Sequence, residues 1–315
     1  MAKEELESLP GVGVATVEKL QTAGYRTLMS IAVANQGELI DATGMTLAAV
    51  KKAIAAARAA VKMDFESADK YEERRKDIQK ITTGSEAFDA MIGGGVETRA
   101  MTEAFGEYGS GKTQIGHILA VNLQKLANEK GPMYTVYIDT ESTFRPDRIR
   151  QLAKGAGLDE EKVLKSIIVA RAHNTDHQML LAEKVEELIT QKKINIKLLV
   201  VDSLTAHFRA EYIGRGTLAD RQQKLNRHLR TLLKTAEAFN LCVYFTNQVM
   251  AKPDVLFGDP TQAIGGHIVA HASTYRIYLR KGRKGSRVAK LVDSPSHPEG
   301  ECSFFLSATG LKDIK

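Results

Sequence analysis

Short apolar runs alternate with longer amphipathic segments along most of the chain after residue 80. The runs are typical of buried strands, whereas the segments between them carry apolar residues at helical spacing. The expected strands are 100–105, 135–139, 166–170, 197–202 and 241–246, and the expected helices are 145–152, 177–190 and 218–239. This alternation predicts right-handed βαβ units, and therefore a mostly parallel sheet covered by helices on both faces. Ligands of such sheets bind at the carboxyl ends of the strands.

The pattern changes near the end of the chain. Two strand-like segments, 274–279 and 287–292, flank the basic stretch 281–286, which predicts an antiparallel hairpin with a basic turn. A polar interruption at 293–299 precedes a last expected strand at 303–306.

The first sixty residues have a different character. Residues 9–20 place Pro-Gly-Val-Gly before an apolar helical pattern, and 42–52 form a weaker copy without the second glycine. This arrangement is similar to a helix-hairpin-helix, whose turn presents backbone N–H groups to a DNA phosphate. The alternative is a small helical domain whose glycines only shape turns.

A segment dense in alternating charge, 65–77, separates these two regions and contains one prominent aromatic residue, Phe65. Such a change of composition marks a linker. We therefore expect a helical domain at 1–62, a linker at 63–80 and an α/β core at 81–315.

The first core strand leads directly into a glycine-rich stretch that an expected helix follows. It reads Gly106-Glu107-Tyr108-Gly109-Ser110-Gly111-Lys112-Thr113. Every fixed position of the G-x-x-x-x-G-K-[ST] pattern is filled, in the strand–loop–helix setting that the pattern requires. We expect the whole stretch and Gln114 to bind nucleotide, with Lys112 on the β/γ-phosphates and the Thr113 hydroxyl on Mg²⁺. The alternative is a glycine-rich turn that merely opens a helix.

Polar residues follow three of the expected strands. Asp202 ends one and is expected to support Mg²⁺, Glu141 is placed to activate a water beside the γ-phosphate, and Gln248 to hydrogen-bond that phosphate. The alternative for each is strand-end capping or solvation.

Two long polar stretches leave the same edge of the sheet, at 208–217 and at 249–271. Loops of this length in a compact domain are usually functional or disordered. Their composition suits a grip on single-stranded DNA, and the alternative is a lid over the nucleotide. The residues expected to contact DNA are Arg209, Tyr212, Arg215, Arg221, Gly265 and Gly266.

Composition and charge exclude only a few classes of protein function. The 315 residues carry a formal net charge of +6, which favours an anionic partner such as nucleic acid. No apolar run has membrane-spanning length and the N-terminus is acidic, so we expect a cytoplasmic, nucleoid-associated protein with no membrane partner. The two cysteines, Cys242 and Cys302, lie in strand-like segments and are expected to be buried free thiols.

With these motifs in view, the chain resembles the archaeal RadA recombinases, a family of the RecA superfamily related to the eukaryotic strand-exchange recombinases. The resemblance covers nearly the whole length. It is carried by residues 9–25, 83–85, 103–114, 137–148, 202–205, 214–224, 246–249, 264–267 and 293–295. Two departures are His297, where an apolar residue is expected, and Tyr108, where phenylalanine is more usual.

The resemblance implies a role for several further residues. Glu141 is the catalytic carboxylate, assisted by Lys112, and Gln248 couples the γ-phosphate to the second DNA loop. Arg148 lies against the adenine. From a neighbouring subunit, the segment from Asp293 to Pro298 caps the nucleotide and His271 approaches the phosphates. Phe65 and Ala68 match the family's Phe-x-x-Ala polymerisation motif.

The resulting hypothesis is a DNA-dependent ATPase that uses ATP and Mg²⁺, and a strand-exchange recombinase. It would form helical filaments on single-stranded DNA, pair them with homologous duplex DNA, self-associate into filaments or rings and meet recombination mediators. Two alternatives share the RecA-like P-loop core, namely a recombinase paralogue that uses ATP only to gate DNA binding, and a hexameric helicase.

Overall fold

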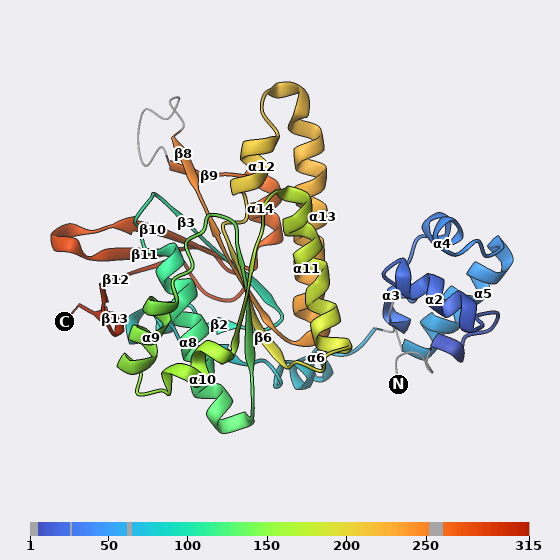
Figure 1. Ribbon diagram of the computed structural model, residues 1–315, viewed down its shortest axis with the longest axis horizontal. Helices are drawn as coiled ribbons and strands as arrows, with labels where there is room; N and C mark the ends of the chain where they lie inside the picture. The colour runs from blue at the N-terminus through green and yellow to red at the C-terminus, as the bar shows by residue number, and fades with distance from the viewer. Residues whose placement is uncertain (1–5, 26, 62–64, 252–260, 315) are drawn as a thin grey trace. The chain divides into compact units, whose positions relative to one another are not determined.

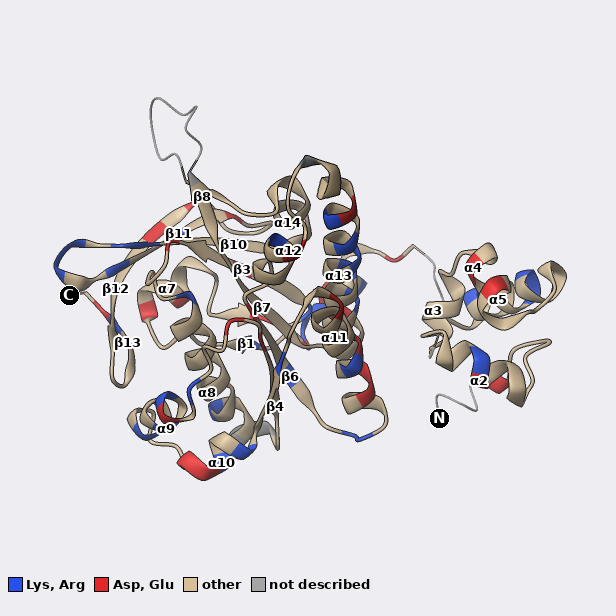
Figure 2. Cartoon of the chain, turned by 45° about the horizontal axis from the view of Figure 1, so that its top comes forward, with Lys and Arg blue, Asp and Glu red and all other residues tan. Residues whose placement is uncertain are grey.

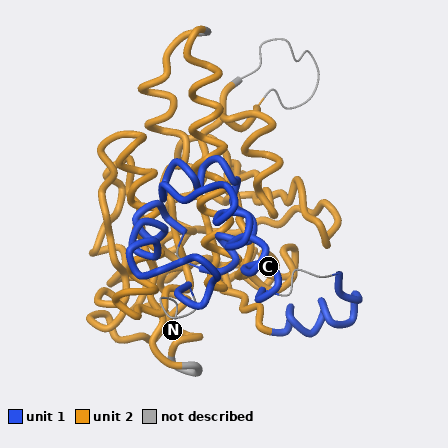
Figure 3. Tube along the Cα trace, turned by 90° about the vertical axis from the view of Figure 1, so that its right-hand side faces the viewer, with its two compact units in different colours: residues 1–76 blue, residues 77–315 orange. Residues whose placement is uncertain are grey.

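The computed structural model of the chain describes residues 6–25, 27–61, 65–251 and 261–314 (Figure 1). The chain divides into two compact units, residues 1–76 and 77–315 (Figure 3). Each unit has its own hydrophobic core.

The first unit is entirely helical in its described residues. Its helices are α2 (Val14–Thr22), α3 (Leu28–Ala32), α4 (Gln36–Thr43), α5 (Leu47–Val61) and α6 (Ala68–Arg75). Side chains cap two of them, because Thr27 accepts from the Ser30 N–H in a capping box and Asn35 accepts from the Gly37 N–H. Buried Val17, Leu20 and other apolar residues form the core of this unit. The expectation that the first part of the chain forms a helical unit is confirmed.

Helix α6 lies inside the predicted linker, where the charge pattern alone did not predict a helix. None of its residues is buried, and acidic Asp69 in its first turn and basic Arg74 and Arg75 in its last turn complement the helix dipole. Ala68 is its first residue.

The second unit follows the predicted alternation of strands and helices. Its elements are β1 (Lys80–Ile81), α7 (Glu86–Met91), β2 (Val96–Glu97), β3 (Ala100–Gly106), α8 (Lys112–Lys130), β4 (Tyr134–Asp139), α9 (Pro146–Gly155), α10 (Glu160–Lys165), β5 (Ile167–Arg171), α11 (Thr175–Thr190), β6 (Ile196–Asp202), α12 (Ala206–Glu211), η1 (Arg215–Thr217), α13 (Leu218–Phe239), β7 (Cys242–Asn247), β8 (Val249–Ala251), β9 (Thr261–Ala263), α14 (Gly266–Ala272), β10 (Tyr275–Lys281), η2 (Arg283–Gly285), β11 (Arg287–Asp293), β12 (Gly300–Ser307) and β13 (Gly310–Asp313).

Nine strands of the described residues form the central sheet, in the order β13-β12-β11-β10-β3-β7-β6-β4-β5. The six strands from β10 to β5 run parallel, and β10 to β13 pair antiparallel, so the predicted parallel sheet and basic hairpin are both confirmed. Alternate residues of β4 face opposite cores, Tyr137 one and Val136 with Ile138 the other. Helices α7 to α10 cover the first face, and α11 to α14 cover the second (Figure 1).

The two predicted polar loops are only partly irregular. Residues 206–211 form α12, and its Phe208 is buried in the core rather than exposed to a ligand. The second stretch contains the antiparallel pair β8–β9 and helix α14, while residues 252–260 lie outside the described part. These elements are too short for their apolar spacing to show in the sequence.

The start of the second unit is tied to the core by side chains. Asn240, in the left-handed conformation that ends α13, donates its Nδ2–H to the Asp77 carbonyl oxygen (3.0 Å). Thr98 Oγ1 accepts the Gln79 N–H, and the Thr98 N–H in turn donates to the Gln79 carbonyl oxygen. The core fold therefore begins at residue 77.

The thiol of Cys242 is buried, as expected, and burial raises its pKa. Cys302 is only half-buried, so the prediction was wrong about the extent of its burial, although burial still raises its pKa to about 12. Both thiols are free. Within the described residues, no helix has the length and apolar character needed to cross a membrane.

Candidate nucleotide and DNA site

A cavity of about 640 Å³ opens at the carboxyl ends of the parallel strands. It brings together most of the residues expected to bind or cleave a nucleotide. Its lining comprises Gly106, Glu107, Tyr108, Gly109, Gly111, Lys112, Thr113, Gln114, Glu141, Thr143, Arg145, Asp202, Ser203, Thr246, Gln248, Val249, Arg287 and Leu306. Ser110 lies within the same loop with its Oγ buried and without a hydrogen-bond partner.

The glycine-rich stretch 106–113, which we call the P-loop, takes its shape from close packing on the neighbouring strand. Gly106 has φ +154°, and a Cβ there would lie 2.0 Å from the Leu279 carbonyl oxygen of β10, so no side chain fits. Below the loop, buried Tyr244 of β7 donates its hydroxyl to the Lys112 carbonyl oxygen (2.8 Å), which holds the first turn of α8 against the sheet.

Lys112 points back over the loop that precedes it. Its Nζ donates to the carbonyl oxygens of Gly106 (2.7 Å) and Glu107 (2.9 Å). Burial lowers the pKa of Lys112, and the negative charges of Asp202 and Glu141 oppose that shift. Its amino group thus lies beside the N-terminus of α8, where no side chain caps the helix.

Asp202 is a buried carboxylate surrounded by hydroxyl groups. Its Oδ2 accepts from Tyr137 Oη (2.8 Å) and Thr143 Oγ1 (3.2 Å), and its Oδ1 accepts from Thr246 Oγ1. Burial and the neighbouring carboxylate raise the pKa of Tyr137, so this hydroxyl remains a donor. The network keeps an anionic oxygen pair at the floor of the cavity.

Glu141 sits on a turn that a second buried carboxylate organises. Asp139, at the end of β4, accepts the N–H groups of Glu141 (3.2 Å), Thr143 (3.1 Å) and Phe144 (3.1 Å). From the end of β7, Gln248 donates Nε2–H to Glu141 Oε1 (2.8 Å). Sequence reasoning selected Glu141 and Gln248, but it missed the role of Asp139, whose position at a strand end was the available signal.

Arg287 is the second residue that sequence reasoning missed. It opens β11, donates Nε–H to the Gly109 carbonyl oxygen (3.0 Å) and donates Nη1–H to the carbonyl oxygens of Gly285 and Ser286. Among the described residues, no carboxylate forms an ion pair with it. The hairpin β10–β11, whose tip gathers Lys and Arg residues (Figure 2), therefore contributes a cation to the cavity wall.

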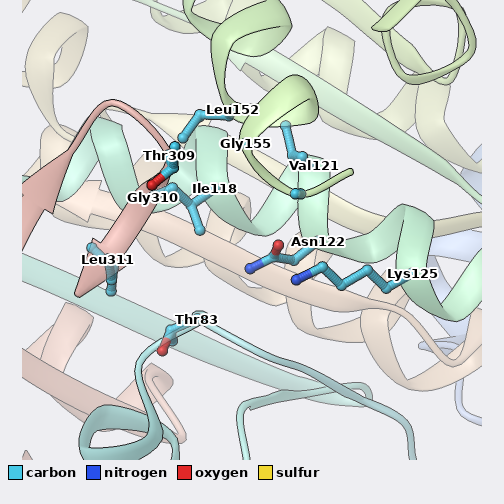
Figure 4. Close-up of a pocket in the computed structure, with 12 residues that line it drawn as sticks. Thr83, Ile118, Val121, Asn122, Lys125, Leu152, Gly155, Thr309, Gly310 and Leu311 are labelled. Carbon is cyan, nitrogen blue, oxygen red and sulfur yellow. The ribbon is translucent and has the colours of Figure 1, made fainter. Parts of the chain in front are cut away.

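Arg148 does not line this cavity. Its guanidinium donates to Gln114 Oε1 (2.7 Å) and to the carbonyl oxygens of Ser307 (2.7 Å) and Ala308 (2.8 Å), which clamps the β12–β13 turn against α8. Beyond this turn lies a smaller cavity of about 90 Å³, between the middle of α8 and Thr309 to Leu311 (Figure 4). It contains no P-loop residue, and the expected contact of Arg148 with adenine stays a prediction.

The expected cap residues lie outside the cavity within the same chain. Asp293 and Pro298 are both exposed, at either end of a turn in which Ser294 Oγ accepts the His297 N–H (3.0 Å). The His297 ring stacks on Tyr275 at 6.4 Å, so a histidine fills the place where an apolar residue is expected. His271 stacks on His267 of α14 at 5.9 Å.

The residues expected to contact DNA are spread over the two segments beyond the cavity. Arg209 is exposed on α12, Arg221 is half-exposed on α13, and the Arg215 side chain lies outside the described part of the structure. The Lys224 Nζ lies over the Tyr212 ring, 5.5 Å from the ring centre. The hydrogen bond from Lys224 to Asp176 raises the pKa of Lys224. Gly265 has φ +96°, and a Cβ there would lie 2.3 Å from Val269, so its first role is to start α14; Gly266 begins that helix.

The donor set fits a magnesium nucleotide. The uncapped N-terminus of α8, Lys112 and Arg287 offer positive charge to phosphates, whereas the Thr113 hydroxyl and Asp202 offer the oxygen ligands that Mg²⁺ prefers. The buried, unpartnered Ser110 Oγ has an unused hydrogen-bonding position in the same loop.

Known proteins similar to this chain share both of its units. Residues 74–314 match the Rad51 family, and residues 3–59 match the SAM-like helix-hairpin-helix tandem. The chain is 50% identical over 312 residues to the DNA repair and recombination protein RadA of Aeropyrum pernix, in a match that covers 98% of this chain and 97% of that relative.

Proposed function

This chain belongs to the Rad51 family of DNA repair and recombination proteins, and from that membership we propose that it is a DNA-dependent ATPase that assembles on single-stranded DNA and exchanges strands with homologous duplex. Binding of nucleotide and of DNA follows from the family. The finer proposal is that ATP with Mg²⁺ is the nucleotide, and that hydrolysis is coupled to the state of the DNA loops.

One observation supports this proposal above the others, namely the 2.8 Å contact between Gln248 Nε2 and Glu141 Oε1 in the wall of the P-loop cavity. Glu141 is the base that accepts a proton from the attacking water, on a turn that Asp139 keeps rigid. Gln248 immediately precedes β8 and hence the second loop, so its amide connects the reacting end of the cavity to that loop. Thr113 and Asp202 would hold Mg²⁺, which supplies neutralisation of phosphate charge.

The composite site is the second part of the proposal. Asp293 and Pro298 would cap a nucleotide bound to a neighbouring subunit, with His271 near its phosphates. Phe65 would join consecutive subunits. Either a filament or a ring follows from a head-to-tail contact of this type. A ring in the presence of single-stranded DNA would favour the helicase alternative.

Glu141→Gln tests the catalytic assignment. The amide keeps the shape of the side chain but cannot act as a base, so we expect ATP hydrolysis to fall at least 100-fold while the affinity for ATP changes less than about 3-fold. Steady-state hydrolysis with and without single-stranded DNA gives the first value, and equilibrium binding of a fluorescent ATP analogue gives the second. Lys112→Ala is the matched comparison, because it should weaken binding itself. Equal loss of binding in both variants would contradict the role of Glu141.

A further inference from the structure

A buried polar network below the cavity joins four segments of the second unit. Its centre is Asn247, the last residue of β7, which is fully buried. Its Nδ2 donates to Glu103 Oε1 (2.7 Å) and to the Ile264 carbonyl oxygen (2.7 Å). Its Oδ1 accepts from Thr205 Oγ1 (2.7 Å). The catalytic scheme uses none of these groups.

The partners define the orientation of the Asn247 amide. Glu103 and the Ile264 carbonyl can only accept hydrogen bonds, so each takes one N–H of Asn247 Nδ2. The Thr205 hydroxyl then donates to Asn247 Oδ1. Glu103 is also fully buried, and its Oε2 accepts from Arg276 Nε (2.7 Å), which balances its charge. The charge balance and the complete pairing make the network rigid.

Two of the bonded atoms lie at the bases of the two segments proposed to face DNA, which we call the DNA-facing segments: 206–217, which follows Thr205, and 249–263, which lies between Gln248 and Ile264. Thr205 is the residue before α12, and its carbonyl oxygen accepts the Arg209 N–H, but its hydroxyl does not cap the helix because it bonds to Asn247. Ile264 follows β9 and precedes Gly265, and its N–H donates to the Gln248 carbonyl oxygen (3.0 Å). Asn247 is therefore bonded to the base of each segment and is adjacent in sequence to Gln248.

We propose that Asn247 is a positioning residue that fixes the two DNA-facing segments to each other, so that DNA held by one is sensed by the other and by Gln248. The inference rests on the proposed function for its DNA readout, but the physical link it describes exists without DNA. Glu103 carries the same link to β3, three residues before the P-loop.

Thr205→Val removes only the hydroxyl that bonds Asn247, and Thr205→Ser restores it. In hydrogen–deuterium exchange without DNA, we expect Thr205→Val to speed amide exchange both at 206–212 and at 261–266 by about 2- to 10-fold, the factor that one hydrogen bond between neutral groups is worth. Thr205→Ser should exchange like the parent protein. Faster exchange confined to 206–212, or no change at all, would overturn the proposal.

The rate of ATP hydrolysis then measures how this link affects stimulation by DNA. The ratio of rates with and without single-stranded DNA should fall by about 2- to 10-fold in Thr205→Val and recover in Thr205→Ser, while the DNA-free rate and the affinity for ATP stay unchanged. An unchanged ratio, or an equal fall in the serine variant, would count against positioning by Asn247. Absence of DNA stimulation in the parent protein would instead refute the proposed function, and the exchange measurement would still decide the link.

Discussion

Buried histidine at position 228 connects the stability of the core to pH. His228 on α13 is fully buried, its ring stacks on Phe208 at 5.9 Å, and its Nε2 lies 3.2 Å from Gln178 Nε2. Because Gln178 Nε2 can only donate, His228 Nε2 carries no proton and accepts this hydrogen bond, so the imidazole is neutral. Burial lowers the pKa of His228 to about 4.

We expect His228→Phe to weaken the acid sensitivity of the core. An unfolded histidine takes up its proton near pH 6.5, whereas the folded one remains neutral down to about pH 4, so the stabilisation is present above pH 6.5 and is lost as the pH falls. This residue alone should lower the free energy of unfolding by about 2 kcal/mol between pH 7 and pH 5. Urea unfolding at both pH values measures the difference. The same pH dependence in both proteins would contradict the assignment.

Residues proposed to act on a ligand were easier to select from the sequence than residues that position them. Glu141 and Gln248 follow recognisable strands, and their types suit water activation and phosphate contact, so sequence alone selected them. Asp139 and Arg287 act through backbone groups of distant segments, the turn at 141–144 and the P-loop at Gly109. A contact with a backbone group leaves no pattern in the sequence of the partner, which explains why both were missed.

The hairpin β10–β11 contacts the P-loop through the two residues that flank its tip, the last of β10 and the first of β11. Lys281 ends β10 close to Gly109, where an added Cβ would lie 3.3 Å from its Cε, and Arg287 begins β11. Arg287→Ala should weaken ATP binding by about 10-fold, because a cation and a support of the P-loop are removed together. The control is Arg283→Ala, which removes the same charge from the exposed tip. Isothermal titration with a non-hydrolysable analogue should separate them, and equal affinities would exclude the role.

The segment from α12 to the start of α13 carries exposed Arg209 and half-exposed Arg221, which we propose contact DNA. Each ion pair between a basic side chain and a phosphate of single-stranded DNA contributes about 0.7 units to the slope of log affinity against log salt. We therefore expect Arg209→Ala and Arg221→Ala each to weaken single-stranded DNA binding and to flatten this slope. Arg150→Ala, on α9 and paired with Glu161 at 2.6 Å, is the control. A salt titration with unchanged slopes would assign DNA to another surface.

Long elements were predictable and short ones were not. Strands such as β4, β6 and β7 and the helix α13 follow their predicted ranges within a residue or two, because burial on a sheet or along a helix repeats over many positions. Helix α12 is only 6 residues long, and β8 and β9 have 3 each. Tertiary contacts such as the Thr205–Asn247 bond define them, and no periodicity reports such contacts.

At the scale of the whole molecule, Phe65 is an apolar residue that its own described chain leaves fully exposed. The sheet ends on one side at β5, where Val169 is 42% exposed, and an edge of this kind accepts an added strand. Burial of the ring on another subunit would contribute roughly 1.5–3 kcal/mol. We expect Phe65→Glu to give monomers that still bind nucleotide but show little DNA-stimulated hydrolysis.

Tyr71→Glu is the matched control, because it adds the same charge to an exposed aromatic position of α6. It should assemble like the parent protein. Light scattering measures both variants at equal concentration. Large assemblies of Phe65→Glu would show that Phe65 does not join subunits.

The hydrogen bond from Asn240 to the Asp77 carbonyl oxygen defines where the chain can be cut without damage to the second unit. Because the core holds backbone groups of Asp77 and Gln79, and α6 before them buries no residue, a protease should cut within 65–76 and leave two intact fragments. A fragment starting at Asp77 keeps the acceptor of Asn240, whereas one starting at Ile78 loses it. The same point is where recombination between genes could exchange one N-terminal helical unit for another without disturbing the second unit.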